Sequence, residues 1–336
     1  MDVKNEKDQT YVLLEKMENS MILMPLLLSF AISVMTGPVI IPFLRKLKAG
    51  QTVREDGPKA HLKKTGTPTM GGFLILISMT IVSVLYVKEY PRTAPVLFMT
   101  LGFGMIGFLD DYFKIVFRSP EGLKAWQKLF LQLALTALFA YYMVSMSGIS
   151  LAMRIPFKPG YYVDFGIWNI PVMFVVVAGC ANGTNFTDGL DGLAGSVTVM
   201  TSAFFTVAAI GLNAGIHPIT CAVTGALLGF LLFNVHPASV FMGDTGSLAL
   251  GGFLAATAYM MQMPLFLPIV GLVYVAEVLS VIVQVAYYKC SGGKRIFKMA
   301  PLHHHFELCG YTENKIVAAF TIITAALCII ALSGIT

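Results

Sequence analysis

The chain has 336 residues, of which 56% are hydrophobic and only 12% are charged. Because soluble domains carry about a quarter charged residues, this composition excludes an ordinary soluble protein. The formal net charge is +5, and we expect no nucleic acid among the partners. The five cysteines show no spacing typical of a disulfide framework.

Apolar runs of about 20 residues predict an all-α polytopic membrane protein with about ten transmembrane helices. The predicted spans are 20–44, 70–88, 94–110, 126–147, 169–186, 191–212, 217–234, 246–262, 265–288 and 314–335. Residues 1–19 are too polar for a signal peptide and predict an amphipathic lead-in outside, ahead of one membrane domain of residues 20–336. Between the fourth and fifth spans, Pro159-Gly160 predicts a small outer hairpin within residues 149–168.

Basic residues indicate how the spans are oriented. Most of the 23 Lys and Arg residues lie in the loops that follow odd-numbered spans. The positive-inside rule therefore places these loops in the cytoplasm and both chain ends outside. Four polar clusters follow spans three, five, seven and nine, whereas the outer loops carry no comparable cluster. This segregation predicts an active site on the cytoplasmic face.

The longest polar cluster is the segment 182–192. Its Asn182, Asn185, Asp188 and Asp191 recur every third residue. On a helix each step of three lags by roughly 60°, so these side chains fan over one side. Interspersed glycines leave room for a ligand near the backbone. A polar loop between two membrane helices is the plain alternative.

Further carboxylates follow spans three and seven. Lys114 lies one helical turn after Asp110, which an ordinary i,i+4 salt bridge also explains. Asp244 lies in the glycine-flanked turn 241–247, where it either caps a helix or binds a ligand. Carboxylates that gather on one face favour a divalent cation, and oxygen ligands select Mg²⁺.

Histidines and a basic loop complete the polar segments. The string His303-His304-His305 binds phosphate and moves protons, forms a zinc site with Cys290 and Cys309, or belongs to a plain solvated loop. Consecutive histidines point in different directions, which argues against zinc. Lys64 precedes the glycine-bearing start of a helix, which is a suitable place to bind an anion. Alternatively, this basic loop only fixes the orientation of the chain in the membrane.

Several ordered strings resemble the phospho-N-acetylmuramoyl-pentapeptide transferase family, a branch of the polyprenyl-phosphate N-acetylhexosamine-1-phosphate transferases. These strings are Thr67-Pro68-Thr69-Met70-Gly71-Gly72, Asp110-Asp111-Tyr112-Phe113-Lys114, the segment 182–192, Phe241-Met242-Gly243-Asp244-Thr245-Gly246 and Pro301-Leu302-His303-His304-His305-Phe306-Glu307. The resemblance covers nearly the whole chain from about residue 20.

The resemblance implies transfer of phospho-N-acetylmuramoyl-pentapeptide from UDP-MurNAc-pentapeptide to undecaprenyl phosphate, with lipid I and UMP as products and Mg²⁺ as cofactor. This is the first membrane step of peptidoglycan synthesis, on which cell-wall biogenesis, cell shape and cell division depend. The implied setting is the lipid bilayer of the bacterial plasma membrane, with a homodimer as the assembly.

The resemblance also assigns residues. The metal ligand is Asp244, and the candidate catalytic residues are Asp110, Asp111, Asp244 and His303. The candidate substrate-binding residues are Lys64, Thr69, Lys114, Lys128, Asn182, Asn185, Phe186, Asp188, Gly189, Asp191, Asn234, Phe241, Ser247, Gln284, His304 and His305. Phe241 is expected to stack on uracil, and Asp110 is the candidate base.

Two other functions share part of the pattern. A sibling transferase for N-acetylglucosamine-1-phosphate has the same aspartates, although the histidine string favours the muramoyl-pentapeptide branch. A transporter keeps its ionisable residues near the bilayer midplane, whereas here Glu277 is the only acidic residue deep in a span. The sequence leaves open whether transfer is direct or passes through a phospho-enzyme.

Overall fold

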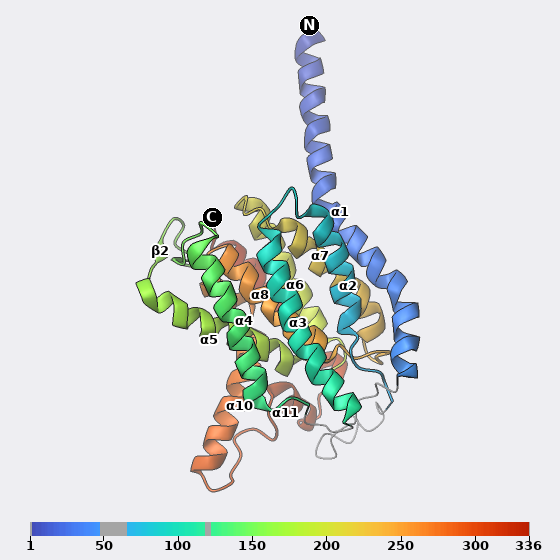
Figure 1. Cartoon of the computed structure of the whole chain (residues 1–336), viewed down its shortest axis with the longest axis vertical. Helices are drawn as coiled ribbons and strands as arrows, with labels where there is room; N and C mark the ends of the chain where they lie inside the picture. The colour runs from blue at the N-terminus through green and yellow to red at the C-terminus, as the bar shows by residue number, and fades with distance from the viewer. Residues whose placement is uncertain (1, 48–65, 118–121, 336) are drawn as a thin grey trace.

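The computed structural model describes residues 2–47, 66–117 and 122–335, and this part is almost entirely helical. Figure 1 shows the helices gathered into one bundle, which confirms the all-α polytopic class. The longer helices are α1 (Asp2–Lys46), α2 (Gly72–Tyr86), α3 (Thr93–Val116), α4 (Ala125–Ser145), α5 (Asn169–Thr187), α6 (Leu193–Gly211), α7 (His217–Asn234), α8 (Gly243–Met260), α10 (Leu272–Cys290) and α12 (Glu313–Leu332).

Eight of the described helices are long and apolar enough to cross a membrane, namely α1 from Leu23 onward, α3, α4, α5, α6, α7, α10 and α12. The predicted second and eighth spans correspond to α2, which has 15 residues, and α8. The count of ten therefore stays a prediction. The lead-in 1–19 is the beginning of α1 from Asp2 onward, and Figure 1 shows it extending beyond the bundle.

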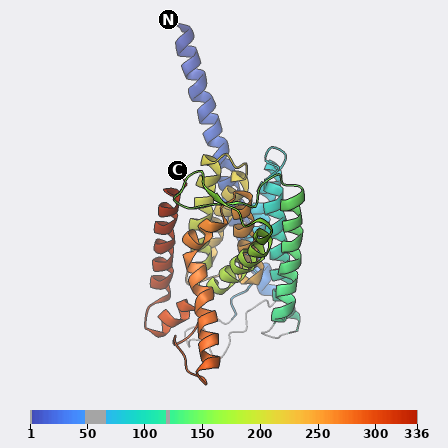
Figure 2. The same cartoon turned by 90° about the vertical axis from the view of Figure 1, so that its left-hand side faces the viewer.

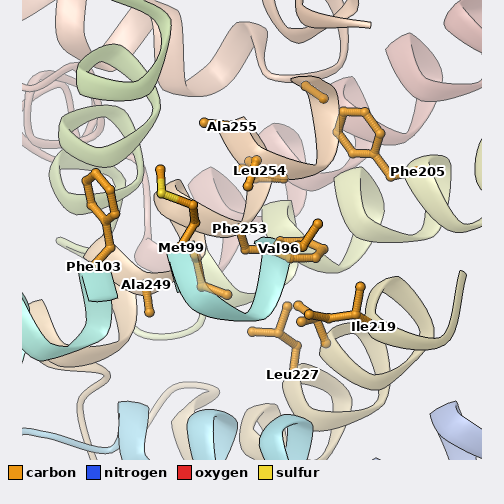
Figure 3. Close-up of a cluster of buried hydrophobic side chains, with 14 of the residues drawn as sticks. Val96, Met99, Phe103, Phe205, Ile219, Leu227, Ala249, Phe253, Leu254 and Ala255 are labelled. Atoms are coloured by element: carbon orange, nitrogen blue, oxygen red, sulfur yellow. The ribbon is translucent and has the colours of Figure 1, made fainter. Parts of the chain in front are cut away.

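The core surrounds α8, whose side chains are buried along nearly its whole length. Phe253 and Leu254 of α8 share one buried cluster with Met99 and Phe103 of α3 (Figure 3). Small residues permit this central position. A Cβ on Gly252 would lie only 2.9 Å from the Met99 carbonyl oxygen. A glycine-rich helix is thus enclosed by its neighbours instead of facing lipid.

The predicted ninth span, 265–288, is interrupted. A 3-10 turn (η3, Pro264–Phe266) and the short α9 (Leu267–Val270) precede α10, which begins after Gly271. Proline in the first turn of both short elements restricts the backbone there. Figures 1 and 2 show the far end of α10 projecting from the bundle, and the short helix α11 (Leu302–Leu308) lies beyond it in sequence.

The predicted hairpin is present. β1 (Met153–Arg154) pairs antiparallel with β2 (Tyr162–Val163), and Met153 is opposite Val163. The Arg154 amide donates to the Gln262 carbonyl at 2.7 Å, just after α8. The hairpin therefore lies at the C-terminal end of α8, and Asp244 lies at the opposite end. A short 3-10 turn (η2, Gly166–Trp168) leads from the hairpin into α5.

Candidate active site

Three aspartates from two helices meet at one end of the bundle. Asp110 and Asp111 lie near the C-terminus of α3, and Asp244 is the second residue of α8. One carboxylate oxygen from each residue lies within 4.8 Å of the other two. This approach depends on Gly107, because a Cβ there would overlap the carbonyl oxygen of Asp244. The two helices thus cross where glycine alone leaves room.

Two lysines bridge the aspartates. The Nζ of Lys114 lies 2.6 Å from Asp110 Oδ2 and 3.2 Å from Asp244 Oδ2. The Nζ of Lys128, on α4, lies 3.2 Å from Asp110 Oδ1 and 2.7 Å from Asp244 Oδ2. The i,i+4 salt bridge of Lys114 is therefore part of a wider network. Lys128 joins that network, whereas the side chain of Lys124 is exposed.

The two adjacent aspartates contact the beginnings of two different helices. Asp111 Oδ2 accepts hydrogen bonds from the Thr245 amide at 2.9 Å and the Thr245 hydroxyl at 2.7 Å, in the first turn of α8. Asp110 Oδ1 accepts the Leu123 amide at 2.9 Å, just before α4. Carboxylates are stabilised at helix N-termini, where backbone amides lack partners. Each aspartate therefore attaches α3 to another helix.

Asn185 extends the site toward α5. Its Nδ2 donates to Asp244 Oδ1 and to Ser247 Oγ, both at 2.9 Å. The Thr184 hydroxyl donates to the Ser247 carbonyl at 2.7 Å, so α5 and α8 are hydrogen-bonded beside the carboxylates. The structure therefore brings together three predicted site residues, Asn185, Asp244 and Ser247.

The string 67–72 lies alongside the residues that precede α8. The Phe241 amide donates to the Pro68 carbonyl at 2.8 Å, and the Gly71 amide donates back to the Phe241 carbonyl at 2.8 Å. The side chain of Thr69 is buried against Gly243. The first and fourth strings of the sequence are thus adjacent. Lys64 lies outside the described residues, and its role stays a prediction.

The segment 182–192 does not form one continuous helix. Helix α5 ends at Thr187, so only Asn182 and Asn185 follow the predicted helical fan. Asp188 and Asp191 lie in the turn that leads to Gly192, whose φ of +79° favours glycine. The expectation that all four side chains fan over one helix was therefore wrong.

Asp188 faces the beginning of α8. Its carboxyl is close enough to Gly243, immediately before Asp244, for the Gly243 backbone to influence its pKa. Burial raises the pKa of Asp188 well above 3.8, and the neighbouring charges of Asp244 and Asp111 raise it further. The backbone amide dipole of Gly243 acts in the opposite direction. Asp188 thus belongs electrostatically to the aspartate cluster.

Asp191 and Asn234 stabilise the turn between α5 and α6. Asp191 Oδ2 lies 3.0 Å from His236 Nδ1, and the Asp191 amide donates to Glu313 Oε1 at 2.6 Å. The Gly192 amide donates to Asn234 Oδ1 at 3.0 Å. These contacts join the turn to the end of α7 and the beginning of α12.

The three consecutive histidines have three different partners. His303 is 1% exposed, and its Nδ1 lies 3.2 Å from Glu277 Oε2. His304 Nδ1 lies 2.7 Å from Glu307 Oε2, and His305 Nδ1 accepts the Lys298 amide at 3.1 Å. Among the described residues, the groups with metal-ligand spacing include none of these histidines. The geometry thus gives no support to the zinc alternative.

Three further predicted site residues, Asn182, Gln284 and Phe186, make no contact with the aspartate cluster that the structure records. Asn182 Nδ2 donates to the Ala178 carbonyl at 2.8 Å and to Gln132 Oε1 at 3.3 Å. Gln284 Oε1 accepts the backbone amides of residues 296 and 297, and Gln284 also lines a cavity of about 390 Å³ between α10 and residues 295–300. Phe186 is partly buried near the end of α5.

In the described part of the chain, two groups have the spacing of metal ligands. One consists of Asp110, Asp111 and Asp244, and the other of Asp191, His236 and Glu313. The first offers oxygen ligands only, which suits a hard cation such as Mg²⁺.

Comparison with known proteins identifies the family. The glycosyl transferase family 4 model matches residues 93–262. The chain is 48% identical over 94% of its length to the phospho-N-acetylmuramoyl-pentapeptide-transferase of Clostridium botulinum (strain Eklund 17B / Type B), and it covers 97% of that protein. The chain belongs to the phospho-N-acetylmuramoyl-pentapeptide transferase family. The enzyme of the same name from Clostridium perfringens (strain ATCC 13124) is 47% identical over 96% of this chain, with 99% of that protein covered.

The family model matches the part of the chain that carries the aspartate cluster. The matched residues 93–262 include α3 and α8, which supply Asp110 and Asp244. Sequence reasoning did not find Gly107 or the partner of Glu277. For Gly107, the available signal was a glycine one helical turn before the aspartates. For Glu277, the signal was an isolated acidic residue deep in a span.

Proposed function

We propose that this transferase-family member moves phospho-N-acetylmuramoyl-pentapeptide from UDP to undecaprenyl phosphate and forms lipid I and UMP. The names of relatives that match nearly the whole chain support this activity. The observation that carries the proposal is the Asp244 carboxylate, which contacts two lysines and lies beside Asp110 and Asp111. Such a cluster suits a diphosphate together with a cation.

The proposed reaction exchanges one pyrophosphate linkage for another. An oxygen of undecaprenyl phosphate attacks the phosphorus that bears the sugar, and the bond from that phosphorus to UMP breaks. No separate energy source is needed, because the number of pyrophosphate bonds is unchanged. Positioning and neutralisation of charge dominate this kind of catalysis. We assign Lys114 and Lys128 the role of stabilising negative charge on the diphosphate.

Asp110 suits a positioning role better than the role of base. It is fully buried, and it contacts both lysines that also contact Asp244. A phosphate monoester loses its second proton near pH 6, so the lipid phosphate is largely a dianion at neutral pH. Direct attack by the dianion requires no protein base, and it also requires no phospho-enzyme.

Mg²⁺ is the proposed cofactor. Asp111 accepts hydrogen bonds from the beginning of α8, and Asp110 and Asp244 both contact the two lysines. Exposure distinguishes the last two, because Asp110 is fully buried whereas the Asp244 side chain is 16% exposed. We therefore assign Asp244 as the principal ligand, with the neighbouring aspartates able to contribute. When bound, the ion neutralises charge on the diphosphate of the nucleotide sugar.

The proposed setting is the bacterial plasma membrane, with the site at the cytoplasmic face and both termini outside. The positive loops support this orientation. The location of the hairpin at the other end of α8 from Asp244 is consistent with it. A homodimer also stays a proposal, which the mass of the protein in nanodiscs tests.

The decisive experiment uses purified protein, undecaprenyl phosphate and Mg²⁺ in mixed micelles and measures UMP release from UDP-MurNAc-pentapeptide. Asp244→Asn is expected to lower turnover by at least about 100-fold, since a charged group at the reacting phosphates is removed. Asp164→Asn is the control, because Asp164 lies by the hairpin. UMP release from UDP-N-acetylglucosamine instead would identify the sibling activity, and no release from either nucleotide would contradict both.

A further inference from the structure

Glu277 is a fully buried carboxylate that the proposed reaction does not use. It lies in α10, and its Oε2 is 3.2 Å from Nδ1 of the buried His303. Its Oε1 accepts the backbone amide of His303 at 3.3 Å. The main chain of His303 is therefore hydrogen-bonded to Glu277, and its side chain lies at ion-pair distance from the same carboxylate without hydrogen-bond geometry. This double contact fixes the beginning of α11 against α10.

The opposite edge of the His303 ring lies against the turn after α5. A Cβ on Gly189 would overlap the Nε2 atom of His303, so the ring occupies the space that a larger residue would fill. This Nε2 makes no hydrogen bond within the described part of the chain. The imidazole is thus enclosed between a carboxylate on one side and the backbone of the turn on the other.

The same turn lies close to the aspartate cluster. Asp188, next to Gly189, is close enough to Gly243, Asp244 and Asp111 for all three to shift the pKa of its carboxyl. Gly243 directly precedes Asp244 and begins α8. Glu277, His303 and the turn are therefore in contact, and the turn lies electrostatically close to the residue proposed to bind the cation.

We propose that Glu277 is a positioning residue that acts through His303 and holds the turn 188–191 against the beginning of α8. The inference deepens the proposed transferase function and rests on it for the kinetic effect. Its physical basis is that an ionisable group buried without its partner is strongly disfavoured. Glu277 and His303 therefore act as a unit, and loss of either is expected to release the turn.

Kinetics provide the first test. Glu277→Gln keeps the size of the side chain but removes its charge. We expect turnover to fall at least about tenfold while KM for the nucleotide changes less than about threefold, because the reacting groups are misplaced. In a His303→Gln background, Glu277→Gln should cause little additional loss. Ser280→Ala, one turn away on α10, removes only an intrahelical hydrogen bond and is expected to keep wild-type turnover.

Hydrogen–deuterium exchange provides a test that does not depend on activity. Amides of residues 188–192 should exchange faster in Glu277→Gln and His303→Gln than in the wild type or Ser280→Ala, while α3 keeps its protection. Unchanged exchange in this turn, or independent multiplicative losses of turnover in the double variant, would overturn the proposal. A wild-type protein without transferase activity would refute the proposed function alone, since the exchange experiment still decides the positioning role.

Discussion

Alanine at position 107 tests whether the crossing of α3 and α8 builds the site. A Cβ at this position overlaps the backbone carbonyl of Asp244, which cannot rotate away as a side chain can. The helices must then separate by roughly 1 Å, a large displacement for a close-packed interior. Overpacking costs about 1–3 kcal/mol, partly offset by the helix propensity of alanine, which is about 1 kcal/mol better than that of glycine.

Activity should suffer more than stability in Gly107→Ala. A displacement of about 1 Å at a reacting group lowers turnover by about 100-fold. Gly104→Ala is the matched control, because it lies one turn earlier and its Cβ would meet Leu76 Cδ1 at 2.9 Å and Ala249 Cβ at 3.3 Å, which are side-chain atoms. UMP release and thermal unfolding in detergent provide the two measurements. If Gly107→Ala matches Gly104→Ala in both, the crossing does not determine the site.

Four other predictions follow from single residues. Asp111→Asn is expected to lower the free energy of unfolding by about 1.5–3 kcal/mol, because charge-assisted hydrogen bonds to Thr245 are weakened; thermal unfolding equal to that of the wild type would contradict this. Asp110→Asn should lower turnover equally across the pH profile if the residue positions the lysines, whereas a loss confined to pH below about 6 would restore the role of base. Because the pKa of Asp188 is raised in the folded state, the folded protein keeps a proton on this carboxyl above about pH 4, where the unfolded chain has lost it. The free energy of unfolding therefore falls as pH rises toward the folded-state pKa of Asp188. Asp188→Asn should therefore lose less thermal stability than the wild type between pH 4 and 7, and parallel pH profiles would contradict the assignment. Phe241→Ala should raise KM for the nucleotide roughly tenfold, and Phe241→Trp should raise it less, since base stacking is worth about 1–3 kcal/mol; unchanged KM would assign Phe241 to packing.

Counting spans was enough to predict where the polar clusters meet. Alternating membrane helices bring the ends of every second span to one face, whatever their order in the bundle. This argument places Asp110, Asn185 and Asp244 at the same end without any knowledge of packing. The structure brings these three together through Lys114, Lys128 and direct hydrogen bonds. The hairpin followed equally from local turn chemistry at Pro159-Gly160.

The helix boundaries depended on information that the sequence pattern lacks. The three-residue repeat in 182–192 continues beyond Thr187, although the helix stops there. Gly192 adopts a positive φ, and contacts with α7 and α12 determine the path of the turn. In the ninth span, hydrophobicity continues through Gly271, and hydropathy alone therefore gave no sign of the break before α10.

The separate roles of Asp110 and Asp111 show why a motif specifies chemistry better than it specifies contacts. Adjacent residues on a helix point about 100° apart, so two identical side chains face different neighbours. One faces the beginning of α4 and the other the beginning of α8, and only the packed bundle determines which. The same limit applied to Glu277. The sequence shows it only as an isolated acid deep in a span, and the structure supplies its partner, His303 of α11. A buried charge in a membrane span is thus informative only together with its partner, and here the partner connects it to the site.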